Sequence, residues 1–157
     1  MYNEWSLDVF YNGIDDPALA RDMEKLEATV ARCKQAVATL NYDDTAKTLC
    51  EMIDIKETIT LLVHRLAGYF SLRRSANSGD TEVSAYMTKI QMMMASLARE
   101  NVAFEKYVGG IEDIDAVIAG NEVLEAYRFY FGEIKASVSH NMSDDAEDVF
   151  ARMNISG

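Results

Sequence analysis

The histidines and cysteines of this sequence are His64, His140, Cys33 and Cys50, the residue types that most often bind transition metals. A zinc-peptidase helix needs two histidines four positions apart with a glutamate between them, so that both imidazoles reach one metal. A di-iron helical bundle needs paired Glu-x-x-His motifs. Neither histidine is followed by a second one at that spacing, and neither has a glutamate three residues before it. The sequence therefore excludes both kinds of centre within this chain.

The four residues are better explained by structural roles in helices. His64 lies beside a long apolar stripe, which favours a partly buried helix histidine. We expect His140 to mark the C-terminus of a helix, where a protonated imidazole is favoured by the helix dipole. Cys33 and Cys50 are interpreted as small apolar core residues, because no further metal ligands stand near them.

Two other segments invite a site and are given a structural interpretation. Met87, Met93 and Met94 fall on an apolar stripe, so the Met92-Met93-Met94 run is expected to pack rather than to bind metal or peptide. The acidic SDDAED segment lacks the spacing of a calcium-binding loop. No glycine-rich phosphate loop and no Ser/His/Asp set occurs. The sequence thus assigns no catalytic, cofactor-binding or metal-ligating residue to this chain.

The composition and net charge of the chain limit the classes of partner that it can bind. Of 157 residues, 49% are hydrophobic and 26% charged, as in a soluble globular domain, and the net charge is −11. That charge argues against nucleic acid and anionic lipid, which both attract basic surfaces. No apolar run approaches the ~18 residues of a membrane span, and the N-terminus lacks the features of a signal peptide. Two cysteines without a secretory signal fit a reducing cytoplasm.

Apolar periodicity predicts helices throughout. Asp16 can cap the first helix, with Pro17 at its first position, and Asn121 can cap the fifth. The expected helices are residues 17–40, 45–76, 81–108, 112–119 and 122–139, with a sixth starting at Ser143, where Asp144 and Asp145 would favour the helix N-terminus. In the first three helices the inward residues are Leu19, Met23, Leu26, Val30, Cys33, Val37, Leu40; Leu49, Met52, Ile53, Ile59, Leu62, Val63, Leu66, Tyr69, Phe70; and Val83, Tyr86, Met87, Ile90, Met93, Met94, Leu97, Phe104, Tyr107, Val108.

Short turns between these helices make neighbours antiparallel. The sequence therefore predicts one all-α domain over residues 1–157, an up-down bundle of about five to six helices built from long hairpins. Matching the apolar stripes places Cys33 opposite Cys50, as neighbouring reduced thiols, and Phe70 opposite Met87. In the fifth helix, Leu124, Tyr127, Tyr130, Phe131, Ile134 and Val138 are expected to face inward.

Three stretches, in order along the chain, resemble oligoendopeptidase F-type proteins, the zinc metallopeptidases of family M3. The first is WSLDVFYNGIDDPALARDMEKLE, with Trp5, Leu7, Tyr11, Gly13 and Pro17 followed by a helix carrying Asp22. The second is FEKYVGGIE, and the third is LEAYRFYFGEIKASVSHNMSDDAEDVFARMNISG. The resemblance spans the chain without large gaps.

The resemblance implies an N-terminal, non-catalytic helical lobe of a cytoplasmic zinc oligopeptidase that hydrolyses short peptides. The family's HExxH zinc helix lies further along than this chain extends, so the chain alone is expected to bind no zinc and to be inactive. Its partner would be the catalytic lobe, and Gly157 would be a boundary within a longer protein. The alternative is a stand-alone helical interaction module without enzymatic activity.

An exposed apolar surface is expected near the aromatic run of Tyr127, Phe129, Tyr130 and Phe131. On a continuous helix Phe129 points about 200° away from Tyr127 and cannot share its inward stripe. We expect Phe129 to pack on the absent lobe, on the last helix or on a neighbouring copy. The isolated chain would then self-associate more readily than its charge suggests.

Overall fold

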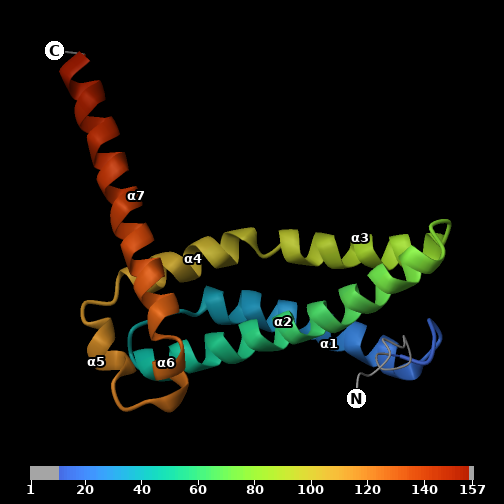
Figure 1. Cartoon of the computed structure of the whole chain (residues 1–157). Coiled ribbons are helices and arrows are strands. Elements are labelled where there is room, and N and C mark those ends of the chain that lie inside the picture. The colour runs from blue at the N-terminus through green and yellow to red at the C-terminus, as the bar shows by residue number, and fades with distance from the viewer. Residues whose placement is uncertain (1–10, 156–157) are drawn as a thin grey trace, which may run out of the picture. The chain divides into compact units, whose positions relative to one another are not determined.

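The structure, a computed structural model, describes the backbone of residues 11–155 and the side chains of residues 11–141. Its helices are α1 (Pro17–Ala38), α2 (Thr45–Ala76), α3 (Thr81–Ala95), α4 (Ala98–Gly109), α5 (Ile114–Ile118), α6 (Glu122–Ala126) and α7 (Arg128–Ile155), shown in Figure 1. No strand occurs between residues 11 and 155. The predicted all-α fold, built on long antiparallel hairpins, is confirmed.

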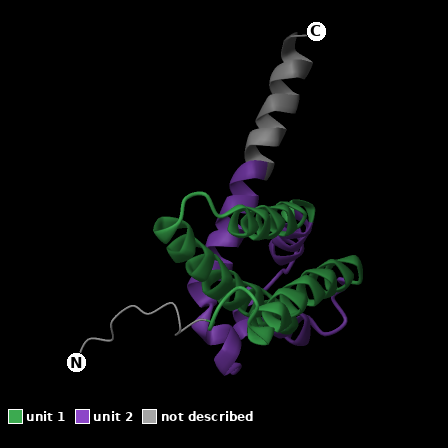
Figure 2. Ribbon diagram, turned by 90° about the vertical axis from the view of Figure 1, so that its right-hand side faces the viewer, with its two compact units in different colours: residues 1–39, 51–99 green, residues 40–50, 100–157 purple. Residues whose placement is uncertain are grey.

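The chain divides into two compact units, coloured in Figure 2. Unit 1 consists of Met1–Thr39 and Glu51–Arg99, and therefore contains α1, most of α2, and α3. Unit 2 consists of Leu40–Cys50 and Glu100–Gly157, and contains the first turns of α2 together with most of α4 and the helices after it.

In unit 1, α1 begins where the sequence predicts. Asp16 caps the helix by accepting a hydrogen bond from the Ala18 amide at 2.9 Å, and Pro17 takes the first position. Two ion pairs then join α1 to α2, at 3.3 Å between Asp22 and Arg65 and at 3.0 Å between Arg32 and Asp54. Residue numbers rise along one helix as they fall along the other, so the first hairpin is antiparallel.

Helix α3 returns along α2 in the same way. The rings of Phe70 and Tyr86 stack with centroids 5.0 Å apart and planes 9° apart, and Arg73 pairs with the α3 capping residue Asp80 at 3.3 Å. Lys89 of α3 lies 3.7 Å from Glu27 of α1. Each of the three helices therefore contacts the other two around a common core.

Most of the predicted inward residues are buried. In the first three predicted helices they are Leu19, Met23, Leu26, Val30, Cys33, Leu49, Met52, Ile53, Ile59, Leu62, Leu66, Tyr69, Phe70, Val83, Ile90, Leu97, Phe104, Tyr107 and Val108. Ile55 is also completely buried, although it lies off the predicted stripe of α2. A helix with neighbours on two sides buries a wider arc than a single hairpin contact requires.

The helix predicted over residues 81–108 is wrong in one respect, because it is two helices. Helix α3 ends at Ala95 and α4 begins at Ala98. At the break, the Ser96 hydroxyl donates to the Met93 carbonyl at 2.7 Å, and the Leu97 amide bonds to Met94 instead of continuing the helical ladder. Serine competes with helix hydrogen bonds in this manner.

The end of the chain also differs from the prediction. The expected helix over residues 122–139 is interrupted at Tyr127, whose amide closes a turn on the Leu124 carbonyl at 3.0 Å. Helix α7 then runs without interruption past Ser143, where the sequence predicted a new N-terminus. No glycine or proline stands between His140 and Ser143. A propagating helix has little reason to stop there, because starting a new one requires a costly nucleus.

Candidate functional site

The segment FEKYVGGIE, one of the three that resemble the oligoendopeptidase F family, is held in unit 2 by contacts between two tyrosines. Tyr42 and Tyr107 stack with ring centroids 4.5 Å apart and planes 10° apart. The Tyr42 hydroxyl donates to the Tyr107 carbonyl at 2.9 Å, and the Tyr107 hydroxyl donates to the Asn41 carbonyl at 2.7 Å. A methyl group on Gly110 would overlap the Tyr42 hydroxyl, so glycine is required for this close approach.

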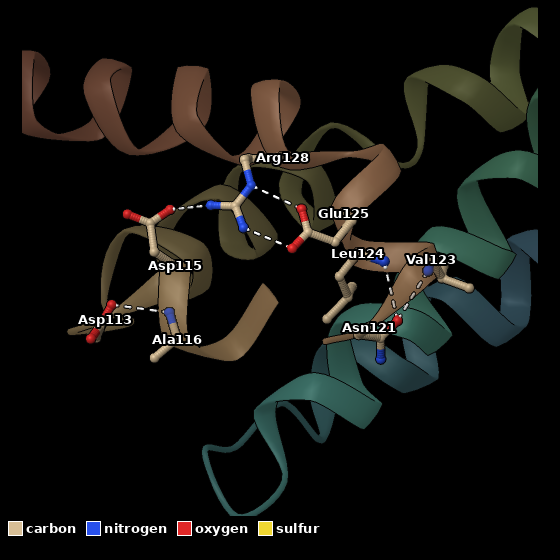
Figure 3. Close-up of polar contacts among 8 residues, drawn as sticks. All are labelled: Asp113, Asp115, Ala116, Asn121, Val123, Leu124, Glu125 and Arg128. Carbon is tan, nitrogen blue, oxygen red and sulfur yellow. Dashed lines mark hydrogen bonds and ion pairs between the residues drawn. The ribbon is translucent and has the colours of Figure 1, made fainter. Parts of the chain in front are cut away.

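Among the described side chains of unit 2, the most connected polar cluster is centred on Arg128, the first residue of α7 (Figure 3). Its guanidinium donates twice to Glu125 of α6, at 3.0 and 2.9 Å, and once to Asp115 of α5, at 2.7 Å. These hydrogen bonds lower the pKa of the Glu125 carboxyl and raise that of Arg128. The cluster joins three helices at one corner, and we name it the Arg128 junction (Arg128, Glu125, Asp115).

Helix caps hold the two short helices of this junction. Asp113 accepts from the Ala116 amide at 3.1 Å at the start of α5. Asn121 accepts from the amides of Val123 and Leu124 at 3.1 and 3.2 Å at the start of α6, as the sequence predicted. The Asn121 side-chain amide also donates to the Cys50 sulfur at 3.4 Å. Helices of five residues depend on such caps, because they have few internal hydrogen bonds.

A second polar cluster lies at the start of unit 1. The Tyr11 hydroxyl donates to Asp22 at 2.6 Å, and Arg65 lies 3.3 Å from the same carboxylate oxygen. Burial, followed by this hydrogen bond to an anion, raises the pKa of Tyr11 above its ordinary value. Tyr11 also packs edge-to-face on Tyr69, with centroids 5.1 Å apart. These contacts hold Tyr11, which precedes α1, against α1 through Asp22 and against α2 through Tyr69.

Both predictions for the histidines are wrong. His64 is exposed on α2 rather than partly buried, because it lies beside the buried stripe and not on it. His140 is exposed inside α7 rather than at a helix C-terminus, because the helix continues to Ile155. Their side chains are positioned by two different helices.

The cysteines and methionines divide between core and surface. Cys33 is buried and Cys50 is half-buried, and the two are not joined by a disulfide. They belong to different units, so their expected face-to-face packing stays a prediction. Met93 and Met94 are half-buried, but Met92 is 68% exposed. The SDDAED side chains lie outside the described residues, as do Trp5 and Leu7 of the first resemblance stretch.

The aromatic run distributes its side chains unevenly. Phe131 is completely buried and Ile134 is 8% exposed, as predicted, whereas the inward prediction for Tyr130 is wrong, because its side chain is 36% exposed. Phe129 is 78% exposed, the highest value among the large apolar side chains of the described residues. The break at Tyr127 means that Phe129 and Tyr127 do not share one helix, but the expected exposure of Phe129 is confirmed.

Within residues 11–141, no group of three or more His, Cys, Asp or Glu side chains is placed to hold a metal ion. No described helix combines the length and apolar character needed to cross a bilayer. The hydrogen bonds and ring contacts of the Tyr42–Tyr107 pair, the Arg128 junction and the Tyr11 cluster join neighbouring segments of the chain. Comparisons with protein-family models, curated proteins and solved structures found no match to this chain.

Proposed function

We propose that this chain is the N-terminal, non-catalytic helical region of a cytoplasmic zinc-dependent oligopeptidase of the oligoendopeptidase F type. Its role would be to form a wall of the substrate channel and to restrict access to short peptides. The zinc, the HExxH helix and the general base would belong to the catalytic lobe, which the chain contacts as its partner.

Several of the described residues that carry the family resemblance take part in the contacts that join the helices. Tyr11 and Asp22, both in the first stretch, are hydrogen-bonded to each other, and Pro17 starts α1 between them. Gly109 and Gly110 in the second stretch sit against Val138 and Tyr42 at distances that admit no further side chain. These positions are constrained by packing, which is how a rigid non-catalytic wall would use them.

The observation that carries the proposal is the exposure of Phe129. At 78% exposed, the Phe129 ring offers a large apolar surface that a partner can cover. Unit 2 also exposes Tyr42, Val102, Val123 and Tyr130, whereas unit 1 exposes only Leu61 and Met92 among described large apolar residues. Unit 2 is therefore the part of the chain that we assign to contact with the catalytic lobe.

Isolation of the native polypeptide with an antibody against this chain tests the proposal. The expected product is larger than 17.6 kDa and cleaves quenched fluorescent peptides, with activity lost on treatment with a zinc chelator. A native polypeptide of 17.6 kDa without peptidase activity would contradict the proposal and favour the stand-alone interaction module.

A further inference from the structure

Unit 1 contains a pocket of about 320 Å³, and none of the residues of the Tyr11 cluster lines it. Its lining comes from the turn before α1, through Ile14 and Asp15, and from one face of α3, through Glu82, Ala85, Tyr86 and Lys89. The volume is at the lower end of the roughly 300–1,000 Å³ range of small-molecule sites. It therefore suits a small ligand rather than a folded partner.

The charges in the lining are unequal. Within the described residues, Asp15 and Glu82 have no hydrogen-bond or ion-pair partner. Lys89 is the single cation of the lining, and its ammonium group lies 3.7 Å from Glu27, which offsets its charge. The lining thus has a formal charge of −1, in a chain whose total charge is −11. A cationic ligand is favoured over an anionic one.

The N-terminus of α3 lies near this pocket and opposes a cation with its partial positive charge. That effect falls off within the first turn of a helix. Asp80 already accepts a hydrogen bond from the Val83 amide at 3.2 Å at this end. The two full negative charges of Asp15 and Glu82 therefore outweigh it.

The remaining lining is apolar and held in place. Tyr86 is half-buried, and its ring stacks on Phe70, which is completely buried. Ile14 and Ala85 add aliphatic surface. An aromatic ring near two carboxylates is a favourable environment for an alkylammonium group, since the ring face attracts cations and the ring edge packs on carbon chains.

We propose that this pocket binds a primary ammonium group carried on a short alkyl chain, with Asp15 and Glu82 as charge partners and Tyr86 as the apolar wall. Two sources share this chemistry, a free alkyl diamine and the lysine side chain of a peptide. The inference is independent of the proposed function, because neither the resemblance nor the contact surface of unit 2 enters it.

Nitrogen-15 NMR titration of the whole chain tests this binding. The probes are cadaverine for the free amine and N-acetyl-lysine methylamide for the lysine side chain, with N-acetyl-norleucine methylamide as an uncharged control. We expect shifts at Asp15, Glu82, Tyr86 and Lys89 with at least one charged probe, weakened by added salt. The stronger of the two probes identifies the source, and equal shifts with the uncharged control overturn the proposal.

Matched variants separate the contribution of the lining charges to binding from that of the cavity shape. Glu82→Gln and Asp15→Asn should each weaken binding about two- to fivefold, as expected for exposed ion pairs. Lys89→Met should strengthen it, because it removes the competing cation. Glu51→Gln, the same charge change on the exposed surface of α2, should leave it unchanged. Unaltered affinity in the Asp15→Asn/Glu82→Gln double variant, or equal loss in Glu51→Gln, would overturn the assignment.

Discussion

Gly109 should be intolerant of the smallest possible side chain, although it ends a helix that alanine would ordinarily favour. A Cβ atom on Gly109 would lie 2.6 Å from Cγ1 of Val138, 3.1 Å from its Cβ and 3.3 Å from its Cγ2. Rotation of Val138 about χ1 moves its two Cγ atoms but leaves its Cβ 3.1 Å away, so a tight contact remains in every rotamer. The backbones of α4 and α7 would have to shift apart by a few tenths of an ångström to relieve it.

Overpacking of this kind costs about 1–3 kcal/mol, and the helical preference of alanine returns at most about 1 kcal/mol. We expect Gly109→Ala to lower the free energy of unfolding by about 1–2 kcal/mol, or by a few degrees in the melting temperature. Gly132→Ala is the matched control. Gly132 lies in α7 with nothing within 4 Å of an added Cβ, so this variant should be slightly stabilised.

The test is chemical denaturation of Gly109→Ala, Gly132→Ala, Val138→Ala and the double variant Gly109→Ala/Val138→Ala. Removing both Val138 methyl groups should relieve the overlap, so the double variant should be no less stable than Val138→Ala alone. Gly109→Ala as stable as wild type, or equal destabilisation in the presence and absence of the Val138 methyls, would refute the reasoning.

Four further outcomes are expected. Asn121→Ala should destabilise by about 1 kcal/mol through loss of the α6 cap, measured by denaturation, and Asn121→Asp should retain most of the stability. Because folding raises the pKa of Tyr11, its hydroxyl stabilises the fold fully below about pH 10, the pKa of an unfolded tyrosine, and this stabilisation is lost as pH rises further. Tyr11→Phe should therefore make the fall in unfolding free energy at alkaline pH less steep, and the same pH dependence in both proteins would contradict this. Phe129→Ser should reduce self-association in sedimentation experiments with little change in stability, whereas a wild-type chain that is monomeric at high concentration would contradict the contact role of Phe129. Chelator-washed chain should retain no stoichiometric zinc by elemental analysis, and tight one-to-one zinc would refute that expectation.

Helical periodicity predicted the long elements because their buried stripes repeat over many turns. Leu19, Leu26, Leu66 and Phe70 are all buried, as the sequence indicates. Local chemistry also predicted the caps at Asp16 and Asn121, since a side chain bonds to amides two or three residues away. These features are decided by neighbours in sequence or by one continuous face.

The breaks and joints could not be predicted as well. Ser96 interrupts a helix through a single hydroxyl hydrogen bond, which many helical serines also make without a break. The Tyr42–Tyr107 pair joins residues far apart in sequence, so no local pattern indicates it. Only the close spacing of Glu125 and Arg128 offered a signal for the Arg128 junction, and Asp115 completes it from another helix.

The coding sequence downstream of the codon for Gly157 tests the central proposal most directly. We predict that the reading frame continues into a further helical region containing an in-frame His-Glu-x-x-His motif, whose two imidazoles would bind the zinc of the catalytic lobe. A stop codon soon after Gly157, or a long continuation without that motif, would contradict the assignment to a zinc oligopeptidase.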